Sequence, residues 1–279
     1  MASVKSAFRT AIKPILFRAL GESSYEYFQY RAKVRDIEGR LVEEDELELF
    51  PALIGRDDET IDIGANFAYL SHRMAGLCDL GAVHAFEPIP FTYRVCKRIV
   101  EHYKLKNVHL YQLGVGATEE TLMFRVPTVD YGAMSAGQAH IAKRDNELAG
   151  REQHYKFNQA REFACKIVTL DTFLPDLKKL TFVKMDIEGA EFYALQGMRG
   201  LIGRHQPVIM LEINPFFLQG YGIAESQLRE FAAEFGYAFF RYVKETRKLV
   251  PFGDAGFVEA NYFMLNTKHQ ALHGALIER

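Results

Sequence analysis

Five acidic residues follow apolar segments of this 279-residue chain: Asp62, Glu87, Asp186, Glu188 and Glu212. A carboxylate at the end of a buried segment costs free energy unless water, a counterion or a ligand compensates its charge. Carboxylates placed in this way can accept hydrogen bonds from a bound nucleoside, take a proton from a reacting group, or coordinate a divalent cation. These residues are therefore the first candidates for a functional site.

A glycine turn surrounds the first carboxylate, in the string Asp62-Ile-Gly64-Ala-Asn66. Glycine leaves room for a ligand to approach the backbone, and a helix after the turn offers free N–H groups and the positive end of its dipole. Glu87 stands 87 − 62 = 25 residues later, near the ~20-residue spacing at which an acid accepts from ribose hydroxyls. We predict a nucleoside-cofactor site formed by Asp62, Gly64, Asn66 and Glu87, together with Gly114 after the third strand.

The residues of that turn favour S-adenosylmethionine over a dinucleotide. A pyrophosphate needs the pattern G-x-G-x-x-G, but here Gly64 is followed by the bulky Phe67 and Tyr69. The carboxylate of Asp62 would repel a pyrophosphate, whereas it can accept from the ammonium group of a methionine moiety. Two alternatives stay open: an NAD-dependent oxidoreductase or epimerase on the same fold, and a non-catalytic module that only binds the cofactor. Gly64 alone could simply end a strand.

A second acidic group lies in the string Lys184-Met-Asp186-Ile-Glu188-Gly-Ala-Glu191, and Glu212 ends the next apolar segment. Adjacent parallel strands lie about 4.8 Å apart, so Asp186 and Glu212 can converge. Two close carboxylates either raise one pKa, which makes a general base, or hold a divalent cation. We expect Asp186 and Glu212 to be catalytic and to bind an acceptor hydroxyl, directly or through a cation. The alternative is structural: Glu191 caps a helix and Glu212 pairs with Lys184.

The elements that would position these residues alternate between strands and helices from residue 58 onward. Strands are expected at 60–63, 82–86, 108–113, 121–126, 163–170, 182–185, 207–211, 237–243 and 261–265, and helices at 67–78, 91–103, 191–201 and 226–235. This alternation implies βαβ units joined by right-handed crossovers. We predict an α/β fold with a Rossmann-like, doubly wound, mostly parallel sheet. Such sheets bind ligands at the carboxyl ends of their strands, where the acidic residues stand.

A long polar insertion, at about 127–162, interrupts the alternation before the fourth strand of that sheet. Loops of this length inside a domain are usually functional or disordered. His140 lies in the insertion and is a second candidate for the general base if the insertion folds over the strand ends. A solvated insertion is the alternative. We expect the acceptor pocket to come from this stretch and from Phe216, Phe217 and Tyr221.

The strings that carry these residues resemble the FkbM family of S-adenosylmethionine-dependent methyltransferases. They are Ile61-Asp-Ile-Gly-Ala-Asn66, Phe86-Glu-Pro88, Val168-Thr-Leu-Asp-Thr-Phe173, Val183-Lys-Met-Asp-Ile-Glu-Gly-Ala-Glu191 with Leu195 and Gly197-Met, and Glu212. The resemblance covers about residues 58–215. One position departs from it, because the family usually has a glycine where this chain has Ala68.

The resemblance implies a class I methyltransferase that acts on hydroxyls of sugars, glycolipids or natural products, with the predicted nucleoside site holding the cofactor. Some related sugar O-methyltransferases hold Mg²⁺ between carboxylates, and Asp186, Glu188 and Glu212 are the positions where this chain could do the same. Residues 1–55 would form an N-terminal helical extension, and residues 56–279 the methyltransferase domain.

Composition limits the remaining possibilities. Thirty-four Lys and Arg against 36 Asp and Glu give 34 − 36 = −2, which argues against a broad nucleic-acid interface and favours a small-molecule or glycan acceptor. Three cysteines without C-x-x-C spacing indicate reduced thiols in a cytoplasmic protein, and no apolar run reaches the ~18–20 residues of a membrane span. Residues 1–20 form a basic, amphipathic helical pattern. We expect this helix to dock on the domain, and the alternative is peripheral membrane contact.

Overall fold

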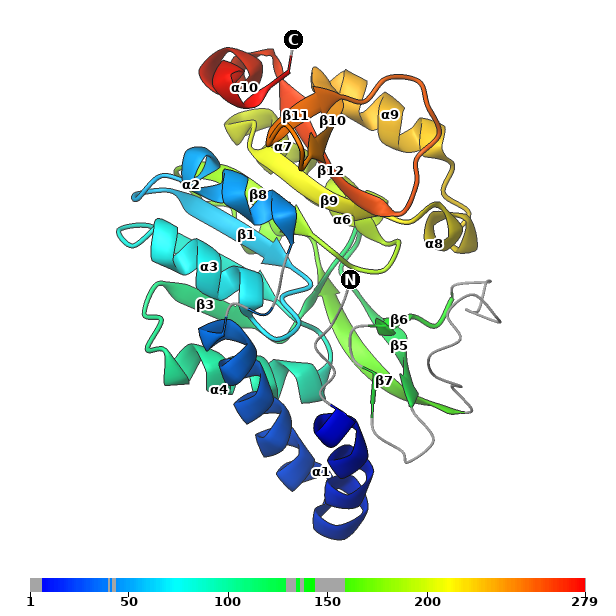
Figure 1. Ribbon diagram of the computed structural model, residues 1–279. Coiled ribbons are helices and arrows are strands. Elements are labelled where there is room, and N and C mark those ends of the chain that lie inside the picture. Colours follow the sequence, from blue (N-terminus) through cyan, green and yellow to red (C-terminus); the bar gives the residue numbers. More distant parts are fainter. Residues whose placement is uncertain are drawn as a thin grey trace.

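The computed structural model describes residues 7–39, 41, 44–128, 134–135, 138–143 and 159–278, and for residues 7–20 it describes the backbone alone. Its centre is an eight-stranded sheet with the order β11-β10-β12-β9-β8-β1-β2-β3 (Figure 1). The strands are β1 (Glu59–Ile63), β2 (Ala82–Phe86), β3 (Val108–Tyr111), β8 (Leu180–Met185), β9 (Val208–Ile213), β10 (Tyr237–Val243), β11 (Lys248–Pro251) and β12 (Ala260–Asn266).

The strand order reverses at β1, which lies between β2 and β8. Strands β3, β2, β1, β8 and β9 pair in parallel, and β12, β10 and β11 extend the sheet beyond β9 through successive antiparallel pairings. The predicted Rossmann-like, doubly wound and mostly parallel sheet is therefore confirmed. Ligands of such sheets bind at the carboxyl ends of the strands beside the reversal, so β1 and β8 mark the place to search for a site.

Helices cover both faces of this sheet. They are α1 (Ala7–Glu38), α2 (Phe50–Leu53), α3 (Tyr69–Leu77), α4 (Pro90–His102), α5 (Leu170–Phe173), α6 (Glu191–Gln196), α7 (Arg199–His205), α8 (Pro215–Gly220), α9 (Glu225–Glu234) and α10 (Thr267–Leu272), with 3-10 helices η1 (Asp45–Leu49) and η3 (Gly274–Leu276). Successive strand residues point to opposite faces, so Phe182 packs with the cluster under η1, α2, α3 and α4, whereas Val183 packs with the cluster under α6, α7 and α9.

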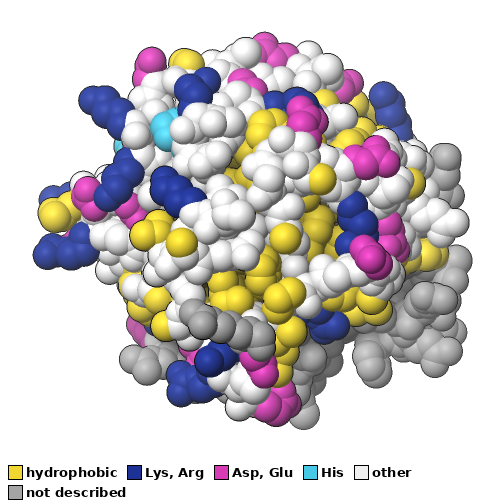
Figure 2. Space-filling view, turned by 90° about the horizontal axis from the view of Figure 1, so that it is seen from above, with side chains coloured by type: hydrophobic (Ala, Val, Ile, Leu, Met, Phe, Trp, Pro, Cys, Tyr) yellow, Lys and Arg dark blue, Asp and Glu magenta, His cyan; other side chains and the backbone are white. Residues whose placement is uncertain are grey.

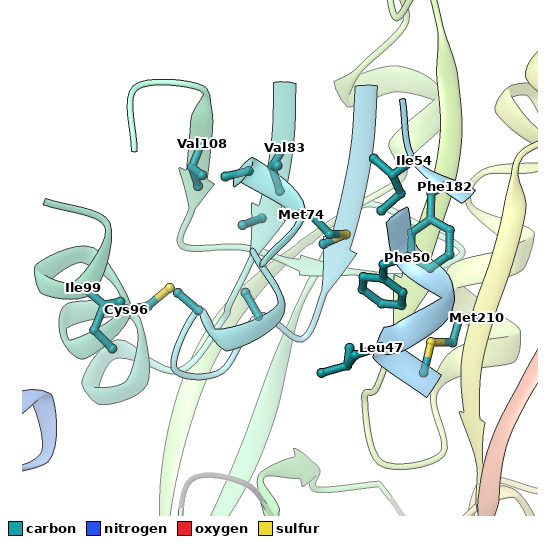
Figure 3. Close-up of a cluster of buried hydrophobic side chains, with 14 of the residues drawn as sticks. Leu47, Phe50, Ile54, Met74, Val83, Cys96, Ile99, Val108, Phe182 and Met210 are labelled. Carbon is teal, nitrogen blue, oxygen red and sulfur yellow. The ribbon is translucent and has the colours of Figure 1, made fainter. Parts of the chain in front are cut away.

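The short segment formed by η1 and α2 is anchored in the first of these clusters. Its side chains Leu47, Phe50 and Ile54 lie against Phe182 of β8 and Met210 of β9 (Figure 3). The rings of Phe50 and Phe182 have their centroids 4.9 Å apart. Aromatic burial of this kind dominates core energetics, so the chain immediately before β1 is held firmly on the sheet.

A second sheet lies at the carboxyl end of the main sheet, at the lower right of Figure 1. Its order is β4-β7-β5-β6, with β4 (Gly114–Val115), β5 (Glu120–Thr128), β6 (His140–Ile141) and β7 (Gln159–Val168). The strands expected near 121–126 and 163–170 exist and pair antiparallel with each other. Of the predicted insertion, residues 129–133, 136–137 and 144–158 lie outside the described residues.

The N-terminal helix α1 changes direction at Gly21, whose φ of 74° and ψ of −178° are not helical. Beyond that residue it runs beside α4 (Figure 1). Glu26 is 5% exposed and pairs with two arginines of α4, accepting from Arg94 Nε at 2.6 Å and from Arg98 Nε at 3.1 Å. The part of α1 after Gly21 therefore docks on the domain. Side chains of residues 1–20 lie outside the described part of the chain, so membrane contact there stays a prediction.

The expected helix at 191–201 is two helices, α6 and α7, because the chain is interrupted at Gly197. A Cβ atom there would lie 1.9 Å from the carbonyl oxygen of Gly116. This close backbone contact fixes the end of α6 against the segment after β4. Sequence periodicity carries no information about such a distant contact.

The surface carries both signs of charge. On the face in Figure 2, Lys and Arg side chains are spread around the rim among Asp and Glu, and hydrophobic side chains gather toward the middle. Within the described part of the chain, no helix combines the length and the apolarity needed to cross a bilayer.

Candidate functional site

Two cavities open at the reversal of strand order. The larger has a volume of about 320 Å³, and Gly64, Phe86, Pro88 and Gly114 are in its wall together with residues of the second sheet. The smaller has a volume of about 160 Å³, and its wall contains Gly64 together with carboxylates and α1 residues. Because Gly64 lines both cavities, the predicted glycine turn lies between them.

The turn depends on left-handed backbone at three positions, with φ of 84° at Gly64, 48° at Asn66 and 56° at Ala68. A Cβ at position 64 would lie 2.1 Å from the carbonyl oxygen of Asp186, so glycine is required both by φ and by the close approach of β8. Asparagine tolerates this region better than most residues. Ala68, where the family usually has glycine, is fully buried at the start of α3 and takes the same left-handed conformation.

Asp62 lines the smaller cavity with a side chain that is 1% exposed. Its Oδ2 accepts from Ser71 Oγ, a residue of α3 that the sequence analysis did not single out. Burial raises the pKa of Asp62, and the hydrogen bond from Ser71 opposes that shift. The structure thus places this predicted cofactor residue at the cavity and fixes its orientation.

Glu87 is 5% exposed and holds the glycine turn to the end of β2. Its Oε2 accepts from the backbone N–H of Asn66 at 3.0 Å, and its Oε1 accepts from the N–H of Ile89 at 2.8 Å. Burial raises the pKa of Glu87 to about 8. Its neighbours Phe86 and Pro88 line the larger cavity but its own side chain is not in that wall, so the predicted contact with ribose stays a prediction.

A buried lysine is the electrostatic centre of the second acidic group. Lys184 is 2% exposed and stands in register with Asp62 on the adjacent parallel strand, so both side chains point to the same face. Its Nζ lies 3.6 Å from Asp186 Oδ2. Burial lowers the pKa of Lys184, but the charges of Asp186, Glu44, Glu212 and Asp62 outweigh it and raise the pKa above its usual value.

Asp186 and Glu212 converge as predicted and share a hydrogen bond. Burial and the charge of Asp186 raise the pKa of Glu212 to about 10, so Glu212 holds the proton at neutral pH and donates it to Asp186. Burial opposes ionisation of Asp186, but Lys184 and the hydrogen bond from Glu212 outweigh it and lower the pKa of Asp186. Asp186 is therefore the ionised member of the pair.

The structure does not support the predicted magnesium site of Asp186, Glu188 and Glu212. Among the residues that the structure describes, no group of three or more His, Cys, Asp or Glu side chains could hold a metal ion. The physical reason is that the ammonium of Lys184 already supplies a buried positive charge, and that Glu212 is protonated. A lysine and a shared proton take the place of a divalent cation.

Glu191 has a structural role, but it does not cap α6 as the alternative given above supposed, because α6 has no side-chain cap. Glu191 is 1% exposed, and its Oε1 accepts from the N–H groups of Ile187 at 2.9 Å and Gly189 at 3.3 Å. Glu188 and Gly189 have φ of 57° and 99°, so the glutamate stabilises a tight turn after β8. Burial raises the pKa of Glu191 to about 7.

His140 is buried on β6, and its Nδ1 lies 3.0 Å from the carbonyl oxygen of Gln138. Its neighbour Ile141 lines the larger cavity, whereas His140 is not among the described lining residues. Neighbouring strand residues point to opposite faces, so the structure does not bring His140 to this cavity, and its role as a base stays a prediction.

Some of the residues predicted to form the acceptor pocket line the larger cavity. Ile141, Lys143 and Tyr221 are in its wall, and Tyr221 Oη accepts from the N–H of Ile141 at 3.0 Å. Phe216 and Phe217 are not among the described residues that line it.

Residues before β1 also contribute to the smaller cavity, which no motif in the sequence predicted. Lys33, Asp36 and Ile37 of α1, and Glu44 before η1, line the smaller cavity with Asp62. The only signal was an excess of acidic residues over 36–59, which does not say where any of them points.

A family model and a curated relative both match this chain. The family model described as "Methyltransferase FkbM domain" matches residues 62–239, more than half of the chain. "Methyltransferase 1" of Beauveria bassiana (strain ARSEF 2860) is 25% identical over 150 residues, which cover 51% of this chain and 59% of that protein. The chain thus spans less than two thirds of this relative.

Solved structures are similar at low sequence identity. The crystal structure of methyltransferase FkbM from Methylobacillus flagellatus KT has 15% identity and a TM-score of 0.47, over 92% of this chain and 59% of that one. TrmK of M. capricolum, in complex with S-adenosyl-homocysteine, has 11% identity and a TM-score of 0.39, over 80% of this chain and 66% of that one.

Proposed function

This chain belongs to the FkbM methyltransferase family, and from that membership we propose that it transfers a methyl group from S-adenosylmethionine to a hydroxyl of a sugar, glycolipid or natural product. The observation that carries the proposal is the family match over residues 62–239. That range contains both the glycine turn and the Lys184–Asp186–Glu212 group.

The residues of the smaller cavity fit the amino-acid end of that cofactor. Asn66 Oδ1 is shielded from solvent and has no hydrogen-bond partner in the described part of the chain, and Asn66 lines the cavity beside the buried carboxylate of Asp62. Buried acceptors without a donor are costly, and an ammonium group would supply the donor. We propose that the methionine end binds here, and that the nucleoside end extends past Gly64 toward Gly114.

Asp186 stands where the two cavities meet, because it lines the smaller cavity while the next residue, Ile187, lines the larger. The bound cofactor supplies a methyl group on a sulfonium sulfur. Asp186 is ionised and its side chain is 43% exposed, so it can accept a hydrogen bond from the acceptor hydroxyl. It would then take that proton as the bond between the acceptor oxygen and the methyl carbon forms and the methyl–sulfur bond breaks, with S-adenosylhomocysteine as the leaving group. Glu212 and Lys184 hold its carboxylate in place, which reduces the cost of orienting the reactants.

The wall of the larger cavity supports an acceptor with both apolar and polar parts. Leu122 and Phe124 of β5 and Ile141 of β6 give it an apolar side, and Gln196 and Tyr221 give it hydrogen-bonding groups. Pockets of this kind bind through apolar contact and select by a few polar groups. A hydroxylated lipid-linked sugar or natural product would satisfy both.

The test is transfer of a labelled methyl group to extracted glycans, lipids and hydroxylated natural products, with Asp186→Asn as the variant. Loss of a general base costs typically about 10² to 10⁴ in rate, so we expect Asp186→Asn to lose activity on that scale and to keep its affinity for S-adenosylhomocysteine. Asp57→Asn, an exposed acid paired with Lys179, is the control.

Full turnover by Asp186→Asn would refute the role of Asp186. Binding of S-adenosylhomocysteine without transfer to any acceptor would favour a non-catalytic module.

A further inference from the structure

Glu44 is a carboxylate from outside the family match that reaches the smaller cavity. It immediately precedes η1, whose Leu47 and Leu49 are 6% and 2% exposed, and Phe50 beyond them is fully buried. Figure 3 shows Leu47 and Phe50 packed over β8 and β9. Side chains fixed in a close-packed core leave little freedom to the residue beside them, so the position of Glu44 is set by packing.

The geometry of the sheet explains why Glu44 meets the other charges. Asp62 and Lys184 are level on neighbouring parallel strands and point to the face that carries Phe182. This is the face that η1 and α2 cover. Glu44 therefore enters the same space from above the sheet, and it lines the smaller cavity together with Asp62 and Asp186.

One oxygen of this carboxylate has no partner. Glu44 Oε2 is shielded from solvent and accepts no hydrogen bond from the residues that the structure describes. Lys184 attracts Glu44, but its Nζ donates to the carbonyl oxygen of Met185 at 3.2 Å and lies 3.6 Å from Asp186 Oδ2. Burial raises the pKa of Glu44, Lys184 opposes that shift, and the charge of Asp186 adds to it. Around Lys184 the carboxylates Asp62, Asp186, Glu44 and Glu212 thus outnumber the one buried cation that the structure describes.

A cationic donor in the cavity would satisfy these acceptors. It would stand near Glu44 Oε2, Asn66 Oδ1 and the buried Asp62, which are the acceptors that an ammonium group with three N–H donors needs. Lys33 and Asp36 line the same cavity as an ion pair, with Nζ and Oδ2 3.8 Å apart.

We propose that Glu44, together with Asp62, binds the α-ammonium group of the methionine end of the cofactor, so that a segment before the family domain completes the cofactor site. This inference rests on the proposed function. It predicts that Glu44 strengthens ligand binding only when the ligand carries the α-amino group.

The test compares two ligands by calorimetric titration: S-adenosylhomocysteine and an analogue that lacks only the amino group. The wild-type chain should bind S-adenosylhomocysteine about tenfold to a hundredfold more tightly than the analogue, since hydrogen bonds to charged groups contribute that much. Glu44→Gln should lose most of this preference and bind the analogue as the wild type does. Glu48→Gln, the same change in η1 at an acid paired with Arg247, should keep the full preference.

A structural role for Glu44 predicts a different result. It would lower the melting temperature of the ligand-free Glu44→Gln variant, whereas removal of a carboxylate with an unpaired oxygen should leave it equal or higher. Equal wild-type affinities for the two ligands, or an equal loss of both in Glu44→Gln, overturn the inference and leave the proposed function standing. Failure of the wild type to bind S-adenosylhomocysteine overturns both.

Discussion

Replacement of Lys184 by methionine removes the one buried cation among the described carboxylates at the strand ends. The side chain is 2% exposed, and its Nζ lies 3.6 Å from Asp186 Oδ2. At an effective dielectric constant of about 20, two unit charges at that distance attract by about 4.6 kcal/mol. Asp186 is 43% exposed, which reduces this figure. Glu44 and Asp62 lose the same countercharge. Breaking a buried pair costs about 3–5 kcal/mol, and we expect a loss within that range.

The loss should depend on pH in a direction fixed by the pKa shifts. In the wild type the pKa of Asp186 is lowered, so Asp186 stabilises the folded state at pH values above its pKa in the unfolded chain. This stabilisation is lost only as pH falls through its pKa in the folded state. The pKa of Lys184 is raised, so its contribution is present below its unfolded pKa. Both are present between pH 5.5 and 8. In Lys184→Met the carboxylates lose their cation and their pKa values rise, so protonation near pH 5.5 should relieve part of the deficit.

The measurement is the free energy of unfolding in urea at pH 8 and pH 5.5. Native domains are stable by about 5–15 kcal/mol, so the variant should still fold. The control is Lys97→Met, because Lys97 is 59% exposed and pairs with Glu101, which is 63% exposed, and such surface pairs contribute about 0–1 kcal/mol. A deficit for Lys184→Met below about 1 kcal/mol at pH 8, or one that is the same at both pH values, would refute the reasoning.

Two further predictions concern the same region. Gly64→Ala should lower the free energy of unfolding by about 2–5 kcal/mol, because the cost of left-handed backbone and the cost of a steric clash add. Gly222→Ala is the control, since Gly222 has a φ of 69° but open space around it, and it should cost only about 1–2 kcal/mol. Equal losses of stability in thermal unfolding would contradict the close contact between Gly64 and Asp186. Glu212 has a raised pKa of about 10, so the free energy of unfolding of the wild type should fall as pH rises from the unfolded pKa of this residue toward that value. Over the same pH window Glu212→Gln should gain stability relative to the wild type by about 1.4 kcal/mol per pH unit. A constant difference in stability between the two proteins would show that Glu212 is ionised.

The central strands and the acids at their ends were predictable because parallel strands buried on both faces are short, continuous apolar runs. The run that ends at Glu212 is of this kind, and so is the run from Phe182 to Met185 apart from Lys184. The right-handed crossover rule then leads to a doubly wound sheet. The glycine turn was predictable for a related reason, since few residues adopt left-handed backbone.

The rest depends on contacts between distant segments. The strands at 120–128 and 159–168 could be located, but their pairing with each other in a separate sheet involves no local signal. Gly197 interrupts a helical pattern because Gly116 approaches it. Glu44 reaches the site because η1 packs on the sheet.

The magnesium prediction, which the structure does not support, left out a residue whose signal was visible in the sequence. Lys184 stands inside an otherwise apolar strand, and a buried lysine requires carboxylate partners. Those partners are Asp186, Glu44, Glu212 and Asp62. Counting this lysine with the acids, rather than as one pairing option for Glu212, would have predicted a charge-balanced group in place of a metal site.

The most direct test of the central claim is calorimetric titration of the wild-type chain with S-adenosylhomocysteine and, separately, with NAD⁺. Saturable one-to-one binding of S-adenosylhomocysteine, with no binding of NAD⁺ at the same concentrations, is the result expected of this glycine turn and its acidic cavity. Binding of NAD⁺ without binding of S-adenosylhomocysteine would contradict the proposal that these residues form the cofactor site of a methyltransferase.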